Sequence, residues 1–193
     1  DSEKAKIGII STGKSFLDTK LGLEKIGINE DVANQVGIKF LKIAMPWPLE
    51  ETVIEKFSEN LEKIIVVEEK RSIIETQVKE ILFNKNLNIK VVGKNDENNN
   101  DLFVSSGALD PGEIGLKIFE IINYLKLPDE VNNLSKKLKS LKEKTNSNIS
   151  LKRVPHFCSG CPHNTSTRIP EGSRAITGIS CAYLVEHMER DNE

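Results

Sequence analysis

Four short runs rich in isoleucine and valine recur along the first half of the chain, and segments with helical spacing of apolar residues separate them. The runs are Lys6 to Ser11, Ile38 to Ala44, Lys63 to Glu68 and Ile89 to Val92. Each run is apolar at successive positions, which is typical of strands buried on both faces of a parallel sheet. The alternation of strands and helices predicts an α/β fold with a mostly parallel sheet flanked by helices.

Helices are predicted between these strands. Phe16, Leu17, Leu21 and Leu23 mark the first, Leu49 to Phe57 the second, and Ile74, Val78, Ile81 and Leu82 the third. Pro48 is placed to open the second helix, and Ser72 with Glu75 forms a capping box in front of the third. Residues 4–93 are therefore expected to form one α/β domain.

Residues 94–153 are predicted to be a loop and a helical connector. The stretch from Lys94 to Asp101 is rich in asparagine and has no periodicity. Asp110 and Pro111 then supply an N-cap and a first-turn proline for a helix that can pack back on the sheet. A further helix, capped by Asp129, has one apolar stripe and many lysines, which favours a solvated amphipathic connector over a docking helix.

Composition excludes several classes of protein. Of the 193 residues, 27 are basic and 29 acidic, so the net charge is -2 and a nucleic-acid-binding excess of basic residues is absent. The mean hydropathy is -0.33, and every apolar run is far shorter than the roughly 18 residues of a membrane span. Three cysteines, an odd number, do not suit a disulfide framework. They favour a reducing, cytoplasmic location and leave a metal site open.

Gly8 to Ser15 matches the phosphate-loop pattern G-x-x-x-x-G-K-S letter for letter. We interpret this match as accidental. A phosphate loop begins where its strand ends, whereas Ile9 and Ile10 are β-branched and belong to the strand itself. Thr12 and Gly13 are therefore expected to form an ordinary turn from strand to helix.

Two thiols that lie two residues apart form the principal candidate site. Cys158 and Cys161 enclose a glycine, so one loop can present both sulfurs to a single metal centre, and Cys181 is a third thiol. Three interpretations remain open on these residues: idle thiols, a zinc site that also uses His163, and three ligands of an iron–sulfur cluster. A dithiol redox pair is less favoured, because the motif does not follow a strand and open a helix.

Other candidates are weaker. His163 lies close to the thiols and could face a cofactor, although a histidine in this position more often caps its loop. Arg168, Glu171 and Arg174 are expected to be solvated surface residues by default. Trp47, between two prolines, is interpreted as packed on the start of its own helix, with an interface or a ligand pocket as the alternative.

Segments covering most of the chain resemble one enzyme family. Residues 157–175 (FCSGCPHNTSTRIPEGSRA), followed by Gly178-Ile179-Ser180-Cys181, resemble the start of the thiamine-diphosphate-binding domain of the large, fused indolepyruvate ferredoxin oxidoreductases. Residues 8–28, 45–50 (MPWPLE) and 64–84 resemble the transketolase C-terminal-like domain that precedes it in that family. The resemblance implies a transketolase C-terminal-like fold for the α/β domain. Residues 154–193 would then be the incomplete start of the next domain.

The resemblance also implies an activity. Members of the family carry out oxidative decarboxylation of an aryl 2-oxoacid such as indolepyruvate, with thiamine diphosphate, magnesium and coenzyme A. They pass electrons through a [4Fe-4S] cluster to ferredoxin. The remainder of the same polypeptide would be the main partner of this chain, and the full-length enzyme is expected to be a homo-oligomer. No nucleic-acid or membrane partner is expected.

Matching positions assign three cluster ligands, Cys158, Cys161 and Cys181, and the fourth cysteine is expected beyond Glu193. No catalytic residue is assigned in this chain, since the family's activating glutamate lies upstream and its magnesium-binding G-D-G motif downstream. We therefore expect a fragment that is inactive by itself. The alternative from another class is a non-enzymatic α/β interaction module with a zinc-binding tail.

The match departs from the family pattern near the cluster ligands. The family usually has glycine at the position of Ser180, histidine at Ala182 and tryptophan near His187. A serine hydroxyl there could donate to a cluster sulfur and alter its potential. The missing histidine could remove a cofactor contact, so the substrate and full activity stay open.

Overall fold

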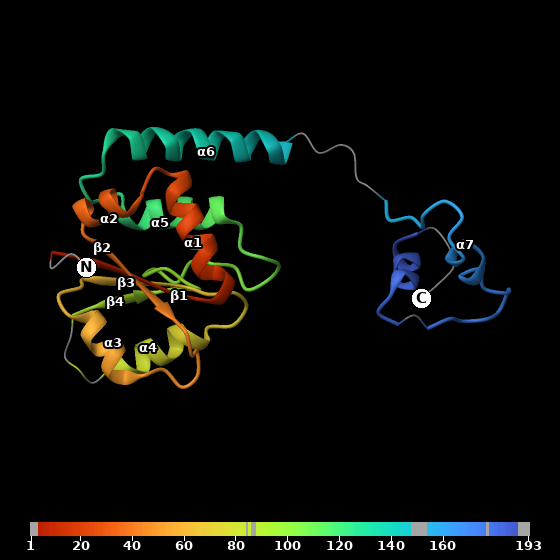
Figure 1. Ribbon diagram of the computed structural model, residues 1–193, viewed down its shortest axis with the longest axis horizontal. Coiled ribbons are helices and arrows are strands. Elements are labelled where there is room, and N and C mark those ends of the chain that lie inside the picture. Colours follow the sequence, from red (N-terminus) through yellow and green to blue (C-terminus); the bar gives the residue numbers. More distant parts are fainter. Residues whose placement is uncertain (1–3, 84, 86–87, 148–153, 177, 189–193) are drawn as a thin grey trace. The chain divides into compact units, whose positions relative to one another are not determined.

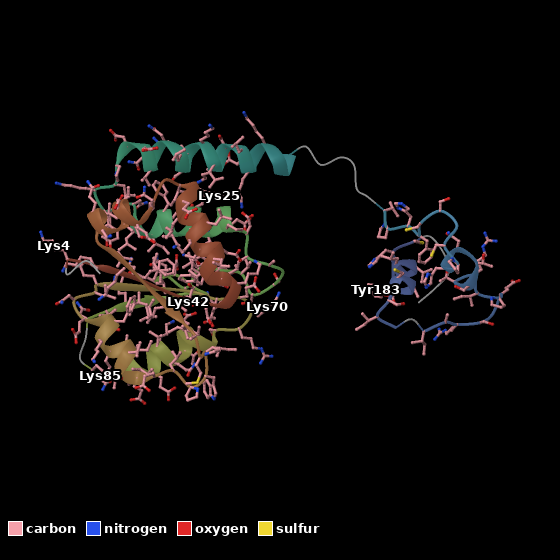
Figure 2. The ribbon with its side chains drawn as sticks, viewed as in Figure 1. Lys4, Lys25, Lys42, Lys70, Lys85 and Tyr183 are labelled. Atoms are coloured by element: carbon pink, nitrogen blue, oxygen red, sulfur yellow. The ribbon has the colours of Figure 1, made fainter. Side chains whose placement is uncertain are left out.

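The computed structural model describes residues 4–83, 85, 88–147, 154–176 and 178–188. The chain divides into two compact units, Asp1–Lys144 and Thr145–Glu193, which are described separately. Figure 1 shows the first unit as a sheet between two layers of helices. Lysines on its surface such as Lys25, Lys70 and Lys85 are exposed to solvent (Figure 2).

The predicted strands and the parallel sheet are confirmed. The strands are β1 Ile7–Thr12, β2 Ile38–Ile43, β3 Lys63–Val67 and β4 Lys90–Val92. Their order is β2-β1-β3-β4, and every neighbouring pair is parallel. The sheet therefore has the most apolar strands, β1 and β3, at its centre, as expected when both faces are covered.

Six helices of the described chain belong to or begin in the first unit. They are α1 Gly13–Lys25, α2 Glu30–Val36, α3 Glu51–Ser58, α4 Ile73–Phe83, α5 Pro111–Ile122 and α6 Asp129–Ser147. In Figure 1, α3 and α4 cover one face of the sheet, and α1, α2 and α5 cover the other. Alternate residues of the strands supply the two cores: Ile7 and Ile9 face α1 and α5, whereas Ile10 faces α3 and α4.

Helix α2 is absent from the sequence prediction. It is only seven residues long, and its apolar residues Val32, Ala33 and Val36 pack on the core without being fully buried, so its periodic signal is short and weak. Its ends nevertheless carry signals: Asn29 accepts a hydrogen bond from the Val32 amide, and Gly37 ends the helix in the left-handed conformation. Capping residues rather than periodicity would have predicted it.

Helix α5, inside the segment predicted as a connector, is part of the core. Its core face consists of isoleucines that are fully buried, Ile114, Ile118 and Ile122. This confirms the prediction that the helix packs back on the sheet. Asp110 Oδ1 accepts the Glu113 amide at 3.0 Å, which confirms the predicted N-cap. An apolar face of this size has to be buried, so a helix that follows an irregular loop can still complete a domain.

The prediction of a solvated amphipathic connector is only partly correct for helix α6. Val131, in its first turn, is fully buried and belongs to the same core, whereas Leu141 is 51% exposed. Lys142 Nζ pairs with Asp110 Oδ1 at 2.6 Å and Glu113 Oε1 at 3.1 Å. The helix therefore packs on the first unit through its early turns and an ion-pair cluster at the start of α5.

The predicted capping box of α4 is wrong. The amides of Ile73 and Ile74 donate to Glu68 Oε2 at 3.0 and 2.9 Å, and the Glu75 amide donates to Glu68 Oε1 at 3.0 Å. Glu68, at the end of β3, thus takes the role predicted for Ser72. Glu75 is instead buried, and its carboxylate accepts Lys79 Nζ at 2.6 Å and the Lys94 amide at 2.8 Å.

The favoured interpretation of Trp47 is also wrong, because its side chain is 69% exposed. The Trp47–Pro48 peptide bond is cis, and α3 begins at Glu51, with Glu50 as its N-cap. The chain at the end of β2 therefore forms a turn of its own before the helix starts.

The second unit has little regular structure. It contains α7 His163–Ser166 and a 3-10 helix, η1 Cys181–His187. In the part of this unit that the structure describes, Phe157 and Val185 are the buried hydrophobic residues.

Among the described residues of the whole chain, none of the helices has the length and apolar character of a membrane span.

Candidate metal centre

The segment Cys158 to Cys161 forms a tight turn. The Cys161 amide donates to the Cys158 carbonyl oxygen at 3.1 Å, and Asn164 Nδ2 donates to the same oxygen at 3.1 Å. Gly160 has φ 76, a conformation that other residues rarely adopt. The glycine therefore permits the turn that brings both cysteines of the motif to one loop.

The His163 ring has two contacts within the second unit, one at its Nδ1 atom and one by stacking. Its Nδ1 lies 3.2 Å from Cys161 Sγ, and the ring stacks on Phe157 with the centroids 5.3 Å apart. Phe157 is buried, so it anchors the ring from inside the unit. The structure thus brings His163 directly to one of the predicted metal ligands.

Cys181 lies at the first position of η1 and is exposed. The preceding Ser180 is the N-cap of this helix, and its Oγ accepts the Ala182 amide at 3.1 Å. This hydrogen bond gives the Ser180 side chain a local structural role. The Ser180 hydroxyl proton is not used in the bond, since Oγ acts there as the acceptor.

The arrangement of the three thiols meets only part of the requirements of a metal or cluster site. All three cysteines are free; Cys158 and Cys181 are exposed and Cys161 is partly buried. Two thiols on one turn suit a thiophilic centre. Within the described residues, however, no three His, Cys, Asp or Glu side chains are gathered in a position to hold a metal ion. The assignment of Cys158, Cys161 and Cys181 as joint ligands therefore stays a prediction.

The remaining candidates near the motif are surface residues. Arg168, Glu171 and Arg174 are all exposed, which agrees with their default interpretation. At the other end of the chain, Gly8 to Ile10 lie inside β1, as predicted, and Ile9 and Ile10 are fully buried. A phosphate-binding loop cannot begin at Gly8, because those backbone groups belong to the sheet.

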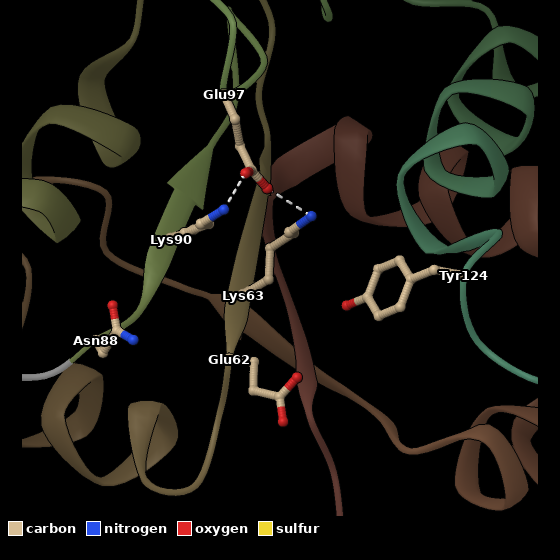
Figure 3. Close-up of a pocket in the computed structure, with 6 residues that line it drawn as sticks. All are labelled: Glu62, Lys63, Asn88, Lys90, Glu97 and Tyr124. Carbon is tan, nitrogen blue, oxygen red and sulfur yellow. Dashed lines mark hydrogen bonds and ion pairs between the residues drawn. The ribbon is translucent and has the colours of Figure 1, made fainter.

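The sequence reasoning missed a second polar site, at the amino-terminal ends of β3 and β4 in the first unit. Lys63 and Lys90 are neighbours in the sheet register, and the Glu97 carboxylate bridges their ammonium groups (Figure 3). They line a pocket of about 420 Å³ with Glu62, Asn88 and Tyr124. The sequence signal for this pocket is a lysine at the start of each of two adjacent strands, followed by a loop with acidic residues.

The solved structures to which this chain is similar include a 2-oxoacid oxidoreductase and a transketolase. A 2-oxoglutarate:ferredoxin oxidoreductase from Magnetococcus marinus is 16% identical with a TM-score of 0.42, over 62% of this chain and 18% of that one. A split-gene transketolase, described as an inactive beta4 tetramer, is 14% identical with a TM-score of 0.42, over 63% of this chain and 40% of that one.

Comparisons of sequence cover more of the chain. Indolepyruvate oxidoreductase subunit IorA of Pyrococcus abyssi is 29% identical over 164 residues, 85% of this chain and 22% of that protein. The Thermococcus kodakarensis subunit IorA is 28% identical over 187 residues, 94% of this chain and 26% of that protein. The chain thus spans about a quarter of the length of these relatives. The model of the indolepyruvate oxidoreductase domain matches residues 1–148, and the chain belongs to this family.

Proposed function

We propose that this chain is part of a thiamine-diphosphate-dependent oxidoreductase that decarboxylates an aryl 2-oxoacid such as indolepyruvate to an acyl-CoA. The observation that carries the proposal is the family match over residues 1–148, which covers the whole α/β unit. The subunit IorA relatives extend the similarity into the segment that carries the cysteines.

The proposed role of the second unit is to hold part of a [4Fe-4S] cluster. Cys158 and Cys161 would be two ligands on one turn and Cys181 a third, with the fourth cysteine elsewhere in the longer polypeptide. When bound, such a cluster carries single electrons, which ferredoxin would accept. This chain contributes the thiolates, the Gly160 turn that joins two of them, and the Ser180 hydroxyl beside the third.

The cofactors that perform the decarboxylation would be bound elsewhere in the polypeptide. Thiamine diphosphate and magnesium need residues that this chain does not supply, and coenzyme A is the proposed acyl acceptor. We assign no catalytic residue here, and we expect the chain alone to be inactive. Of the proposed domains, 4–93 is completed by helix α5 from the connector 94–153, and 154–193 is the start of the thiamine-diphosphate-binding domain. A cytoplasmic homo-oligomer is the proposed state of the whole enzyme.

A zinc-binding interaction module is the second candidate, because Cys161 Sγ and His163 Nδ1 are only 3.2 Å apart. Zinc accepts mixed thiolate and imidazole ligands in a tetrahedral site. In that case Cys158, Cys161, His163 and Cys181 would complete the site within this chain. An iron–sulfur cluster, by contrast, would not need His163.

Metal analysis after anaerobic purification and reconstitution separates the two candidates. We expect the chain to bind iron with acid-labile sulfide, to lose both in Cys158→Ser and Cys161→Ser, and to keep both in His163→Ala. Equimolar zinc without iron, lost in His163→Ala, would establish the module instead. Because the fourth ligand is proposed to lie elsewhere in the polypeptide, the reconstitution includes a small thiol to supply it. A chain that binds neither metal under these conditions would remove the proposed role of the cysteines.

A further inference from the structure

The pocket at the amino-terminal ends of β3 and β4 contains two lysines in an unusual arrangement. Lys63 pairs with Lys90 in the parallel register, so their side chains leave the same face of the sheet. Adjacent strands lie about 4.8 Å apart, and like charges at such neighbouring positions repel. The Lys63 side chain is 14% exposed and that of Lys90 is 62% exposed. An anion between the two ammonium groups relieves their repulsion.

Glu97 is that anion in this structure. Its Oε1 lies 2.6 Å from Lys63 Nζ, and its Oε2 is paired with Lys90 Nζ. Figure 3 shows both ammonium groups directed at the carboxylate. The two oxygens of one carboxylate therefore occupy the place where an external anion with several oxygens would bind.

The Glu97 side chain can leave without unfolding its loop. Asp96 holds the turn by accepting the amides of Asn98 and Asn100, each at 2.8 Å, and Asn100 Nδ2 at 3.0 Å. None of these bonds involves the Glu97 carboxylate. Its removal from the lysines therefore requires a change of side-chain rotamer only.

The rest of the pocket leaves the two lysine charges available to a ligand. Glu62, the other acidic residue of the lining, has its own partner, Lys6 Nζ, at 3.1 Å. The centroid of the Tyr124 ring lies 5.4 Å from Lys63 Nζ, and the ring provides a flat wall. With Glu97 displaced, the lining presents two ammonium groups beside an aromatic ring and the Asn88 amide.

We propose that this pocket binds the phosphate group of a small molecule between Lys63 and Lys90, and that Glu97 occupies the same place until the phosphate displaces it. An external carboxylate would only exchange one single charge for another. A phosphate dianion gains a second charge and a third oxygen, so it can replace the tethered glutamate. The pocket volume of about 420 Å³ leaves room beyond the phosphate for an organic group against Tyr124. This site is independent of the cysteine motif.

Isothermal titration with inorganic phosphate at constant ionic strength tests the proposal. We expect weak binding to the wild-type chain and about tenfold tighter binding to Glu97→Gln, because the internal competitor loses its charge. Adding Lys90→Gln to Glu97→Gln should abolish the gain. Lys90 is 62% exposed, so this second change spares the fold. The matched control is Glu55→Gln. Glu55 pairs with Lys85 at 2.6 Å outside the pocket, so its substitution also frees a lysine from a carboxylate but should leave phosphate binding unchanged.

Three results would overturn the proposal: no tighter binding by Glu97→Gln, an equal gain in Glu55→Gln, or a gain that survives Lys90→Gln. Circular dichroism of each variant establishes that it is folded before titration. A second titration with phenyl phosphate distinguishes the source of the phosphate. Tighter binding than inorganic phosphate, lost in Tyr124→Leu, identifies an organic phosphate monoester, whereas equal binding identifies free phosphate.

Discussion

Glu97 illustrates how a residue in an irregular loop acquires a defined electrostatic role. Its pKa lies below the ordinary value of 4.5, chiefly because Lys63 and then Lys90 donate hydrogen bonds to its carboxylate. Opposite charges favour the ionised form of the acid. The loop that follows β4 is therefore attached to the sheet by a contact that depends on pH.

The sign of this dependence can be predicted. A carboxyl group whose pKa is lower in the folded than in the unfolded chain adds stability above pH 4.5, and this contribution disappears as the pH falls through the folded value. We expect wild type to be more stable than Glu97→Gln at neutral pH, and the difference to shrink below pH 4.5. Urea unfolding at a series of pH values measures it. A difference that stays constant into the acid range would contradict the assignment.

Trp47 shows the limit of inference from one residue and its neighbours. Two flanking prolines suggested a packed aromatic ring, but the side chain is 69% exposed. Met45, two residues earlier, is 59% exposed as well. Exposure depends on which surfaces happen to surround the turn, and no local pattern encodes that.

At the scale of elements, helix α4 depends on a residue outside its own segment. Glu68 directly follows strand β3, and its carboxylate accepts hydrogen bonds from three amides at the start of the helix. A charged acceptor at a helix N-terminus satisfies free amides and also interacts favourably with the helix dipole. The strand and the helix that follows it are thus coupled through one side chain.

Substitution at this cap should separate the observed from the predicted capping residue. We expect Glu68→Ala to lower the free energy of unfolding by about 2 kcal/mol, since buried amides lose their acceptor. Ser72→Ala should change it by no more than about 0.5 kcal/mol. Chemical denaturation of both variants provides the comparison. A loss in Ser72→Ala equal to that in Glu68→Ala would restore the capping box.

Helices α1 and α5 approach each other through glycines. A Cβ on Gly22 would lie closer than 3.0 Å to the Pro111 carbonyl oxygen, and one on Gly115 would lie equally close to the Gly22 carbonyl oxygen. Both obstacles are backbone atoms, which cannot rotate away. The close packing of these helices therefore requires glycine at both positions.

Alanine at Gly22 tests this contact. In an exposed helix the exchange of glycine for alanine gains about 1 kcal/mol, but here we expect a loss of about 1–3 kcal/mol from overpacking. Glu24→Ala, on the exposed side of the same helix, is the control and should stay within about 0.5 kcal/mol. Thermal and urea unfolding report both. Stabilisation by Gly22→Ala would show that the helices can separate without cost.

For the whole molecule, the two units differ in what holds them together. The first has a core on each face of its sheet. In the described part of the second, the buried hydrophobic residues are Phe157 and Val185. Apolar burial is the main stabilising contribution to a fold, so we expect the second unit to be the less stable of the two.

Limited proteolysis of the metal-free chain tests this difference. We expect a resistant product that contains the first unit and rapid loss of residues 145–193, since local stability follows buried contacts. Mass spectrometry of the products locates the cuts. Anaerobic reconstitution with iron and sulfide should slow cleavage of the second unit if the cysteines bind a cluster. Equal resistance of both units without metal would contradict the expectation.

The agreement between sequence and structure is closest where local patterns carry the information. The four strands, the parallel sheet, the Asp110 cap and the apolar face of α5 all follow from periodicity and capping. The family is likewise recognisable from short segments. The turn of the cysteine motif follows from Gly160, whose φ of 76 suits the residue without a side chain.

The arrangements that depend on tertiary structure join residues distant in sequence. The chain's own sequence determined which segments are strands and helices, because backbone propensity and apolar spacing act over a few residues. Only the folded structure placed Glu68 over the start of α4 and Glu97 between Lys63 and Lys90. Such contacts depend on strand order and register, which are set by burial of the whole core rather than by any one segment.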